Sequence, residues 1–174
     1  MSLSPNRRIA RTAAAVFFFD QATKWLVLRH LDYSQEKIII PGFFKFIHVG
    51  NTGAAWSLFT GNNGWLALVA LVALVALYLT RHHFGARSAL GQLALGLIFG
   101  GICGNLFDRL LPDRQQVIDF IYFFISRADG RELGFPAFNL ADSAICTGVG
   151  LIFLLNWKKE EPAKAETSEP TTTP

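Results

Sequence analysis

Residues 64–80 read GWLALVALVALVALYLT, an almost continuous run of leucine, alanine and valine without a charged side chain. A helix needs roughly 20 apolar residues to cross a hydrocarbon layer about 30 Å thick. The run therefore predicts a membrane-spanning helix. The composition agrees with this prediction, because hydrophobic residues make up 51% of the 174 positions and charged residues only 17%, against roughly 25% charged residues in soluble domains.

Three more segments approach the same length and hydropathy, residues 12–31, 89–111 and 138–157. The first of them follows several arginines and resembles a cleavable signal, but Asp20 and Lys24 interrupt its apolar stretch. We therefore expect it to be retained as the first span. The fold class predicted is an all-α membrane protein with four transmembrane helices.

The basic residues indicate how these spans are oriented. Residues 1–11, 81–88 and 158–174 hold eight Lys and Arg, whereas the longer connections 32–63 and 112–137 hold five. Because basic residues accumulate in cytoplasmic loops, both termini and the 81–88 turn are expected in the cytoplasm. The net charge of +3 is spread in this way and not along one soluble face, so we expect no nucleic-acid partner.

The two long connections are expected on the extracytoplasmic side. Residues 37–59 read KIIIPGFFKFIHVGNTGAAWSLF, in which β-branched and aromatic residues alternate with Pro-Gly and Asn-Thr-Gly turn signals. This pattern predicts short strands at the membrane surface. The C-terminal residues are rich in Glu, Thr and Pro and are expected to be disordered. We predict one integral membrane domain over residues 1–160 and a disordered cytoplasmic tail over 161–174.

Ionisable side chains within apolar segments usually mark function, because a charge in the bilayer centre costs about 2.5–3.5 kcal/mol on insertion scales. Asp20 and Lys24 lie four residues apart and can form an ion pair on one helix face. Such a pair either supports the structure, which we favour, or takes part in chemistry.

The third span combines a glycine stripe with a polar end. Gly96, Gly100 and Gly104 recur every fourth residue, which permits close helix packing. Asn105 and Asp108, three residues apart, can share a polar face turned inward. In the simplest structural interpretation, the next residue, Arg109, is an interfacial anchor that pairs with Asp108.

Two further carboxylates lie near the start of the fourth span. Asn139 is a good helix N-cap, and Asp142 three residues later fits a capping box, so capping alone is a sufficient explanation for Asp142. Asp119 has no such explanation, because it lies alone in the apolar run VIDFIYFF. On the predicted topology, both aspartates lie near the outer ends of helices, Asp119 in the outer loop.

Two carboxylates against an apolar surface can share one proton, which is the chemistry of aspartic proteases. One carboxylate takes a proton from water while the other, protonated, donates to the scissile carbonyl. The sequence has no HExxH, GxSxG, Walker A or GxGxxG motif, and its histidines lack metal-ligand spacing. Carboxylates are therefore the remaining catalytic candidates.

Five short blocks together resemble the lipoprotein signal peptidase (signal peptidase II) family. In chain order they are DQATK at 20–24, NTGAAW at 51–56, GGICGNLFDR at 100–109, VIDF at 117–120 and FNLAD at 138–142. Each block alone is weak, but five in the family's order are specific.

The resemblance implies an aspartic endopeptidase of the bacterial cytoplasmic (inner) membrane that cleaves prolipoproteins before their diacylglyceryl-modified cysteine. It implies a four-helix bundle with a small extracytoplasmic β-rich platform, membrane lipid as surroundings, inhibition by the cyclic peptide globomycin, and, we expect, a monomer. It also implies that no metal and no cofactor is needed. By motif, Asp119 and Asp142 match the catalytic aspartates. The matching positions that support or line the site are Asp20, Lys24, Asn51, Gly53, Asn105, Asp108, Arg109, Asn139 and Ala141.

Two other classes of protein remain possible from the residues alone. A small proton-coupled transporter could use the intramembrane carboxylates as a relay, although most of them cluster towards one face. A scaffold that binds lipidated peptides without cutting them differs from the enzyme only in the two aspartates.

Overall fold

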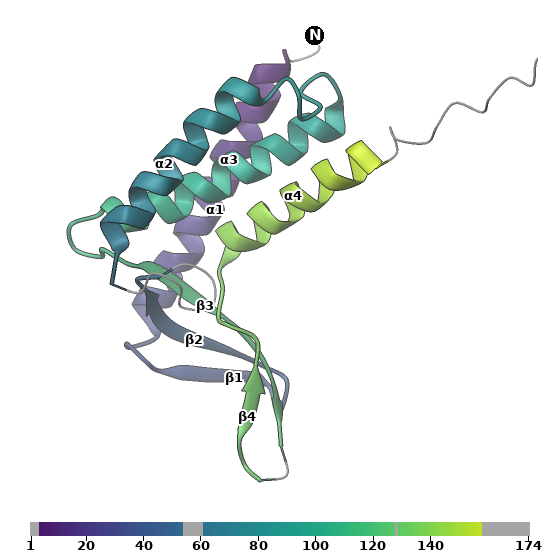
Figure 1. The fold of residues 1–174 in the computed structure, drawn as a ribbon. Helices are drawn as coiled ribbons and strands as arrows, with labels where there is room; N and C mark the ends of the chain where they lie inside the picture. Colours follow the sequence, from purple (N-terminus) through teal and green to yellow (C-terminus); the bar gives the residue numbers. More distant parts are fainter. Residues whose placement is uncertain (1–3, 54–60, 128, 158–174) are drawn as a thin grey trace, which may run out of the picture.

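The computed structural model describes residues 4–53, 61–127 and 129–157 and contains a helical bundle with a small sheet at one end (Figure 1). The tail predicted over 161–174 lies outside the described residues. The helices are α1 (Pro5–His30), α2 (Asn63–Thr80), α3 (Ala89–Leu110) and α4 (Leu140–Trp157).

Among the described residues, three helices are long and apolar enough to cross a membrane, namely α2, α3 and α4. Their bounds lie within two residues of the predicted spans. The first helix differs from its prediction in two ways. It begins at Pro5, which suits a first helical position, and every stretch of 18 residues in it contains at least three charged side chains.

Helix α3 lies between α1 and α4, and glycine makes this packing possible. A side chain at Gly100 would come within 2.6 Å of the Ala13 carbonyl of α1. On the other flank, one at Gly101 would come within 2.5 Å of the Ala141 carbonyl of α4. The predicted role of the glycine stripe in close helix contact is confirmed. By contrast, α2 contacts α3 and leaves most of its apolar surface exposed, as expected for a helix facing lipid.

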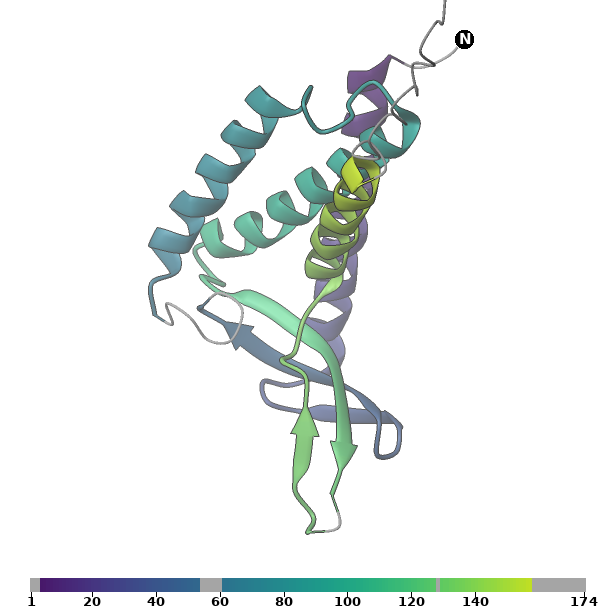
Figure 2. The same cartoon turned by 45° about the vertical axis from the view of Figure 1, so that its right-hand side comes forward.

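The sheet lies across the end of the bundle where α1 ends and α4 begins (Figure 2). Its four antiparallel strands follow the order β1-β2-β3-β4. The strands predicted within 37–59 are confirmed by β1 and β2, while residues 54–59 of that prediction lie outside the described part. The bounds are β1 (Glu36–Ile40), β2 (Phe44–Asn51), β3 (Val117–Ser126) and β4 (Glu132–Gly134).

The strands β3 and β4 were not predicted, and the placement of Asp119 in an outer loop was wrong. Asp119 lies in β3, opposite Val49 of β2. The first four residues of β3 are all buried, so this strand does not show the alternation of apolar and polar residues by which a half-exposed strand is recognised.

A small apolar cluster fixes the sheet to the bundle. Val27 of α1 packs with Ile118 and Phe120 of β3, and Phe46 of β2 covers them. Asp119 lies between Ile118 and Phe120 in sequence, so this packing also sets where its carboxylate stands. The start of α1, the turn between α2 and α3 and the end of α4 lie at the opposite end of the molecule (Figure 1).

Candidate active site

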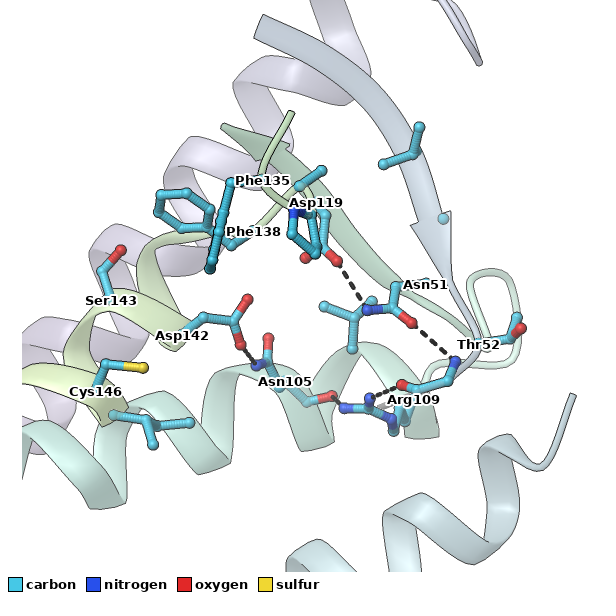
Figure 3. A pocket seen from close by; sticks show the side chains of 17 residues that line it. Asn51, Thr52, Asn105, Arg109, Asp119, Phe135, Phe138, Asp142, Ser143 and Cys146 are labelled. Carbon is cyan, nitrogen blue, oxygen red and sulfur yellow. Dashed lines mark hydrogen bonds between the residues drawn. The ribbon is translucent and has the colours of Figure 1, made fainter. Parts of the chain in front are cut away.

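A cavity of about 980 Å³ lies where the sheet meets the ends of α3 and α4. Figure 3 shows Asp119 and Asp142 on two sides of it, with Asn51, Asn105 and Arg109 along its edge. Of the residues singled out from the sequence, those that line the cavity are Asn51, Gly53, Asn105, Arg109, Asp119 and Asp142. Those that lie behind it are Asp20, Lys24, Asp108, Asn139 and Ala141.

Asp119 is almost completely buried, with 2% of its surface exposed. The neighbouring strand supplies one hydrogen bond, from Asn51 Nδ2 to Asp119 Oδ2 at 2.9 Å. The other carboxylate oxygen accepts from Asn139 Nδ2 at 2.7 Å. Both donors are neutral amides, so Asp119 is held in place without a cation.

Asp142 lies in the first turn of α4 and is only half-buried. Its backbone N–H donates to Asn139 Oδ1 at 2.9 Å, while the Asn139 N–H donates to Asp142 Oδ2 at 3.1 Å. This reciprocal pair is the capping box expected from the sequence. Asn105 Nδ2 of α3 donates to the other oxygen, Asp142 Oδ1, at 2.7 Å. Asp142 therefore caps the start of α4 and lines the cavity at the same time.

Asn139 connects the two aspartates, although it is fully buried and does not reach the cavity. The same side chain donates to Asp119, accepts from the N–H of Asp142 and donates to Asn105 Oδ1 at 3.1 Å. One amide thus sets the relative position of a strand carboxylate and a helix carboxylate.

Electrostatics distinguish Asp119 from an ordinary surface aspartate. Burial, followed by the negative charge of Asp142, raises the pKa of Asp119 to about 7. The hydrogen bonds from Asn51 and Asn139 act in the opposite direction and do not cancel the effect of burial. Near neutral pH the pair therefore holds a proton that an isolated carboxylate would have lost.

Behind the cavity, a second group of charges is completely buried. Lys24 Nζ lies 2.8 Å from Asp20 Oδ2 and 2.7 Å from Asp108 Oδ2, and all three side chains are 0% exposed. The expected Asp20–Lys24 pair is confirmed. Lys24 also donates to Asn105 Oδ1 at 2.9 Å, so the ion cluster supports an amide that contacts Asp142.

Helix α4 contributes to the same cluster through its backbone. The N–H of Ala141, a fully buried residue, donates to Asp20 Oδ1 at 3.0 Å. Ala141 also packs close to Gly104 of α3. A small residue at this position lets the start of α4 approach both neighbouring helices.

The expected pairing of Arg109 with Asp108 was wrong. Asp108 instead pairs with Lys24 and, at 2.6 Å, with Arg114 beyond the end of α3. Arg109 Nη2 donates to the Gly53 carbonyl at 3.0 Å, and the Gly53 N–H donates to Asn51 Oδ1 at 2.8 Å. Because Asp108 and Arg109 are adjacent on a helix, their side chains point in different directions.

Sequence reasoning missed Arg114 as part of this cluster and Phe135 and Phe138 as part of the cavity wall. Arg114 lies four residues beyond Leu110, the last residue of α3, and its closeness in sequence to Asp108 was the available signal for a second cation. No comparable signal marked the two phenylalanines, which are brought to the cavity by the chain between β4 and α4. Within the described residues, no group of three or more His, Cys, Asp and Glu side chains is arranged to hold a metal ion.

Curated proteins named lipoprotein signal peptidase are similar to this chain over most of its length. The one from Azoarcus sp. (strain BH72) is 44% identical over 147 residues, covering 80% of this chain and 77% of the relative. The one from Symbiobacterium thermophilum is 39% identical over 135 residues, covering 78% and 84%. The one from Bacillus subtilis (strain 168) is 38% identical over 144 residues, covering 82% and 88%.

Two solved structures, both described as a bacterial membrane enzyme, share the fold. The one at 2.3 Å resolution has a TM-score of 0.75 and 28% identity and covers 94% of each chain. The one at 1.9 Å resolution has a TM-score of 0.68 and 31% identity, covering 86% of this chain and 92% of the other. A family profile described as signal peptidase (SPase) II matches residues 12–158. Since that match takes in every helix and strand apart from the first turns of α1, the chain belongs to the signal peptidase II family and is a membrane peptidase.

Proposed function

We propose that this chain is an aspartic endopeptidase that removes the signal peptide from prolipoproteins by cleaving before the diacylglyceryl-modified cysteine. The observation that supports this best is the pair Asp119 and Asp142, which line one cavity. Among the described residues, neither has an ion-pair partner. Carboxylates without a neutralising cation remain available for proton transfer.

The proposed mechanism assigns different roles to the two aspartates. Asp119, more buried and with the raised pKa, holds the shared proton. Asp142, half-buried and accepting two hydrogen bonds, is the ionised base. Asp142 takes a proton from a water whose oxygen attacks the scissile carbonyl carbon, while Asp119 protonates the carbonyl oxygen. When the C–N bond breaks, the proton on Asp142 passes to the leaving amine, and as the carbonyl re-forms a hydroxyl of the tetrahedral intermediate returns a proton to Asp119.

Asn51 and Arg109 have supporting roles in this proposal. Both polar ends of the Asn51 amide bond within the protein, to Asp119 and to the Gly53 N–H. Arg109 holds the Gly53 carbonyl and so fixes the segment that orients Asn51. Asn139 positions both carboxylates from behind.

We further propose that all four helices cross the bacterial inner membrane, with both termini in the cytoplasm and the cavity at the extracytoplasmic end. The complete burial of Asp20 and Lys24 allows α1 to cross despite its charges, because the ions meet each other and not lipid. The sheet, at the end of the bundle opposite the start of α1, then forms the extracytoplasmic platform.

This placement suits a lipidated substrate. A diacylglyceryl cysteine stays anchored by its acyl chains, and moving those chains into water costs about 0.8 kcal/mol per CH₂ group. A cavity at the end of the bundle reaches the adjacent peptide bond without that cost. Globomycin binding and a monomeric state stay predictions.

The test is an assay of the purified protein in detergent with one diacylglyceryl-modified precursor. Asp119→Asn and Asp142→Asn are each expected to lower kcat by about 10²–10⁴-fold, the usual contribution of a positioned acid or base, while thermal unfolding still shows a folded protein. Asp113→Asn changes an exposed aspartate of the same connection and is expected to keep full activity. Full activity in either site variant rules out the dyad, and precursor binding without cleavage by the wild type supports the scaffold alternative.

A further inference from the structure

A second cavity lies at the end of the bundle opposite the sheet, between the beginnings of α1 and α3. It is a groove of about 270 Å³. The proposed catalytic residues lie at the other end of α3, so this groove has no part in the peptidase chemistry. The residues that line it are Arg8, Arg11, Thr12, Ala89, Gln92 and Leu93.

Among the described residues, no acidic side chain neutralises the positive charge of this groove. Arg8 and Arg11 are exposed, and neither has an ion-pair partner in the described ranges. The surrounding segments 4–12 and 81–93 contain five arginines and two histidines but no Asp or Glu. The groove also lies at the N-terminal end of the 22-residue helix α3, where the helix dipole favours an anion.

Gln92 provides an independent indication that a ligand binds there. Its side chain is 5% exposed, and Nε2 donates to the Ala86 carbonyl at 3.0 Å. This bond fixes the orientation of the amide, and Oε1 is left buried with no hydrogen-bond donor among the described residues. Buried acceptors are rarely left unpaired. A ligand that fits the groove should therefore carry a donor group as well as negative charge.

An apolar surface adjoins these polar groups. Leu90 and Leu93 of α3 are each 42% exposed, and Ala89 beside them is also exposed. A free anion would leave this surface uncovered, whereas the acyl chains of a lipid would cover it. The combination of arginine, an unpaired acceptor and exposed leucine is that of a lipid headgroup site.

We propose that this groove binds the headgroup of an anionic phospholipid, with the phosphate between Arg8 and Arg11 and a headgroup hydroxyl donating to Gln92 Oε1. Phosphatidylglycerol has this chemistry. Only one part of this inference rests on the membrane orientation given under the proposed function, namely that the lipid belongs to the cytoplasmic leaflet.

The first experiment measures retention of short-chain phosphatidylglycerol by the full-length protein in neutral detergent, using native mass spectrometry. Arg8→Gln combined with Arg11→Gln should weaken binding about thirtyfold, since each basic residue near a lipid phosphate contributes about fivefold. Arg7→Gln combined with Arg87→Gln removes the same charge outside the groove and should weaken binding less than about threefold. Equal losses in the two double variants would overturn the proposal in favour of non-specific attraction.

The second experiment tests the hydroxyl. Phosphatidylmethanol has the same phosphodiester charge without a headgroup hydroxyl, and the wild type should bind it about fivefold more weakly than phosphatidylglycerol, the usual effect of one neutral hydrogen bond. Gln92→Leu should bind the two lipids equally, and a preference that survives in this variant contradicts the role of Gln92. Water-soluble glycerol phosphate should not compete with the lipid; if it does, the site takes a free phosphate. None of these measurements depends on peptidase activity, so they stand or fail separately from the proposed function.

Discussion

Two pairs of aspartates lie close together in this protein, and their surroundings differ in one respect. Asp20 and Asp108 flank the ammonium group of Lys24, and Arg114 adds a second cation. Asp119 and Asp142 are held by the amides of Asn51, Asn105 and Asn139 and by the backbone N–H of Asn139. Asn105 contacts both groups, because its Oδ1 accepts from Lys24 and its Nδ2 donates to Asp142.

The difference explains why adjacent carboxylates can have separate tasks. A carboxylate whose oxygens are held by cations is a good support and a poor proton carrier. A buried carboxylate pair that contacts only neutral donors is destabilised when both members are charged, so it retains a proton near neutral pH. Asp119 is nearly as buried as Asp20 and Asp108, so the presence of Lys24, and not burial, separates it from them.

The largest effect on folding is expected when the positive charge of Lys24 is removed. Lys24→Met leaves Asp20 and Asp108 buried and should lower the free energy of unfolding by about 3–5 kcal/mol, measured by thermal or denaturant unfolding in detergent. Adding Asp20→Asn should recover part of the loss. Lys37→Met, at an exposed lysine of β1, serves as the control and should have little effect. If the Lys24→Met protein has normal stability but no activity, this ion cluster takes part in catalysis and is not only structural.

A smaller effect is expected when the pH is changed, and it arises from the pair Asp119 and Asp142. Because the pKa of Asp119 is about 7, the shared proton is lost above that pH, and kcat/KM should fall about tenfold per pH unit there. The pKa of an unfolded aspartate is about 3.9, so between about pH 4 and pH 7 the folded protein binds more protons than the unfolded chain. Its stability should therefore decrease as pH rises through this window.

The expected decrease in stability with rising pH is tested by measuring the unfolding temperature at about pH 5 and pH 8. The wild type should be less stable at the higher pH, and Asp119→Asn should show a smaller difference because it has no proton to lose. If kcat/KM instead rises steadily above pH 7, Asp119 is not the residue that holds the proton.

The smallest effect on the free energy of unfolding is expected for a carboxylate that forms an ion pair but is exposed to solvent. Glu132 of β4 lies 2.7 Å from Lys45 Nζ, with 38% of its side chain exposed. Glu132→Gln should change the free energy of unfolding by less than about 1 kcal/mol, since exposed ion pairs contribute little and Lys45 keeps Glu36 at 2.6 Å. A loss comparable to that of Lys24→Met would mean that burial is not what distinguishes these ion pairs.

Features that depend on nearby residues could be predicted from the sequence. The apolar runs gave helices α2, α3 and α4 to within two residues. The Asp20–Lys24 pair and the capping box of Asn139 and Asp142 followed from spacings of four and three residues. Family motifs added the residue set of the proposed site, although they did not give the partner of each residue.

Features that join distant parts of the chain could not be predicted from spacing. The strand β3 was missed because burial of its first residues removes the alternating pattern. The partner of Asp108 was assigned to its neighbour Arg109, whereas Lys24 and Arg114 reach it from other segments. Spacing rules within one helix rank only partners on that helix, whereas Lys24 reaches Asp108 when α1 packs on α3 and Arg114 reaches it from the turn after α3.

The sequence by itself determined that the chain is a membrane protein, which segments are helical and where its unusual charges lie, because hydropathy, helix period and capping act over a few residues. Only the tertiary structure decided that Asp108 joins Lys24 and that Asp119 and Asp142 share a cavity. That choice depends on the glycine-lined contact of α3 with α1 and α4, and on the apolar cluster that brings β3 to the end of the bundle. Packing of segments far apart in the chain therefore separates carboxylates of the same chemical type into a support and a proposed catalytic pair.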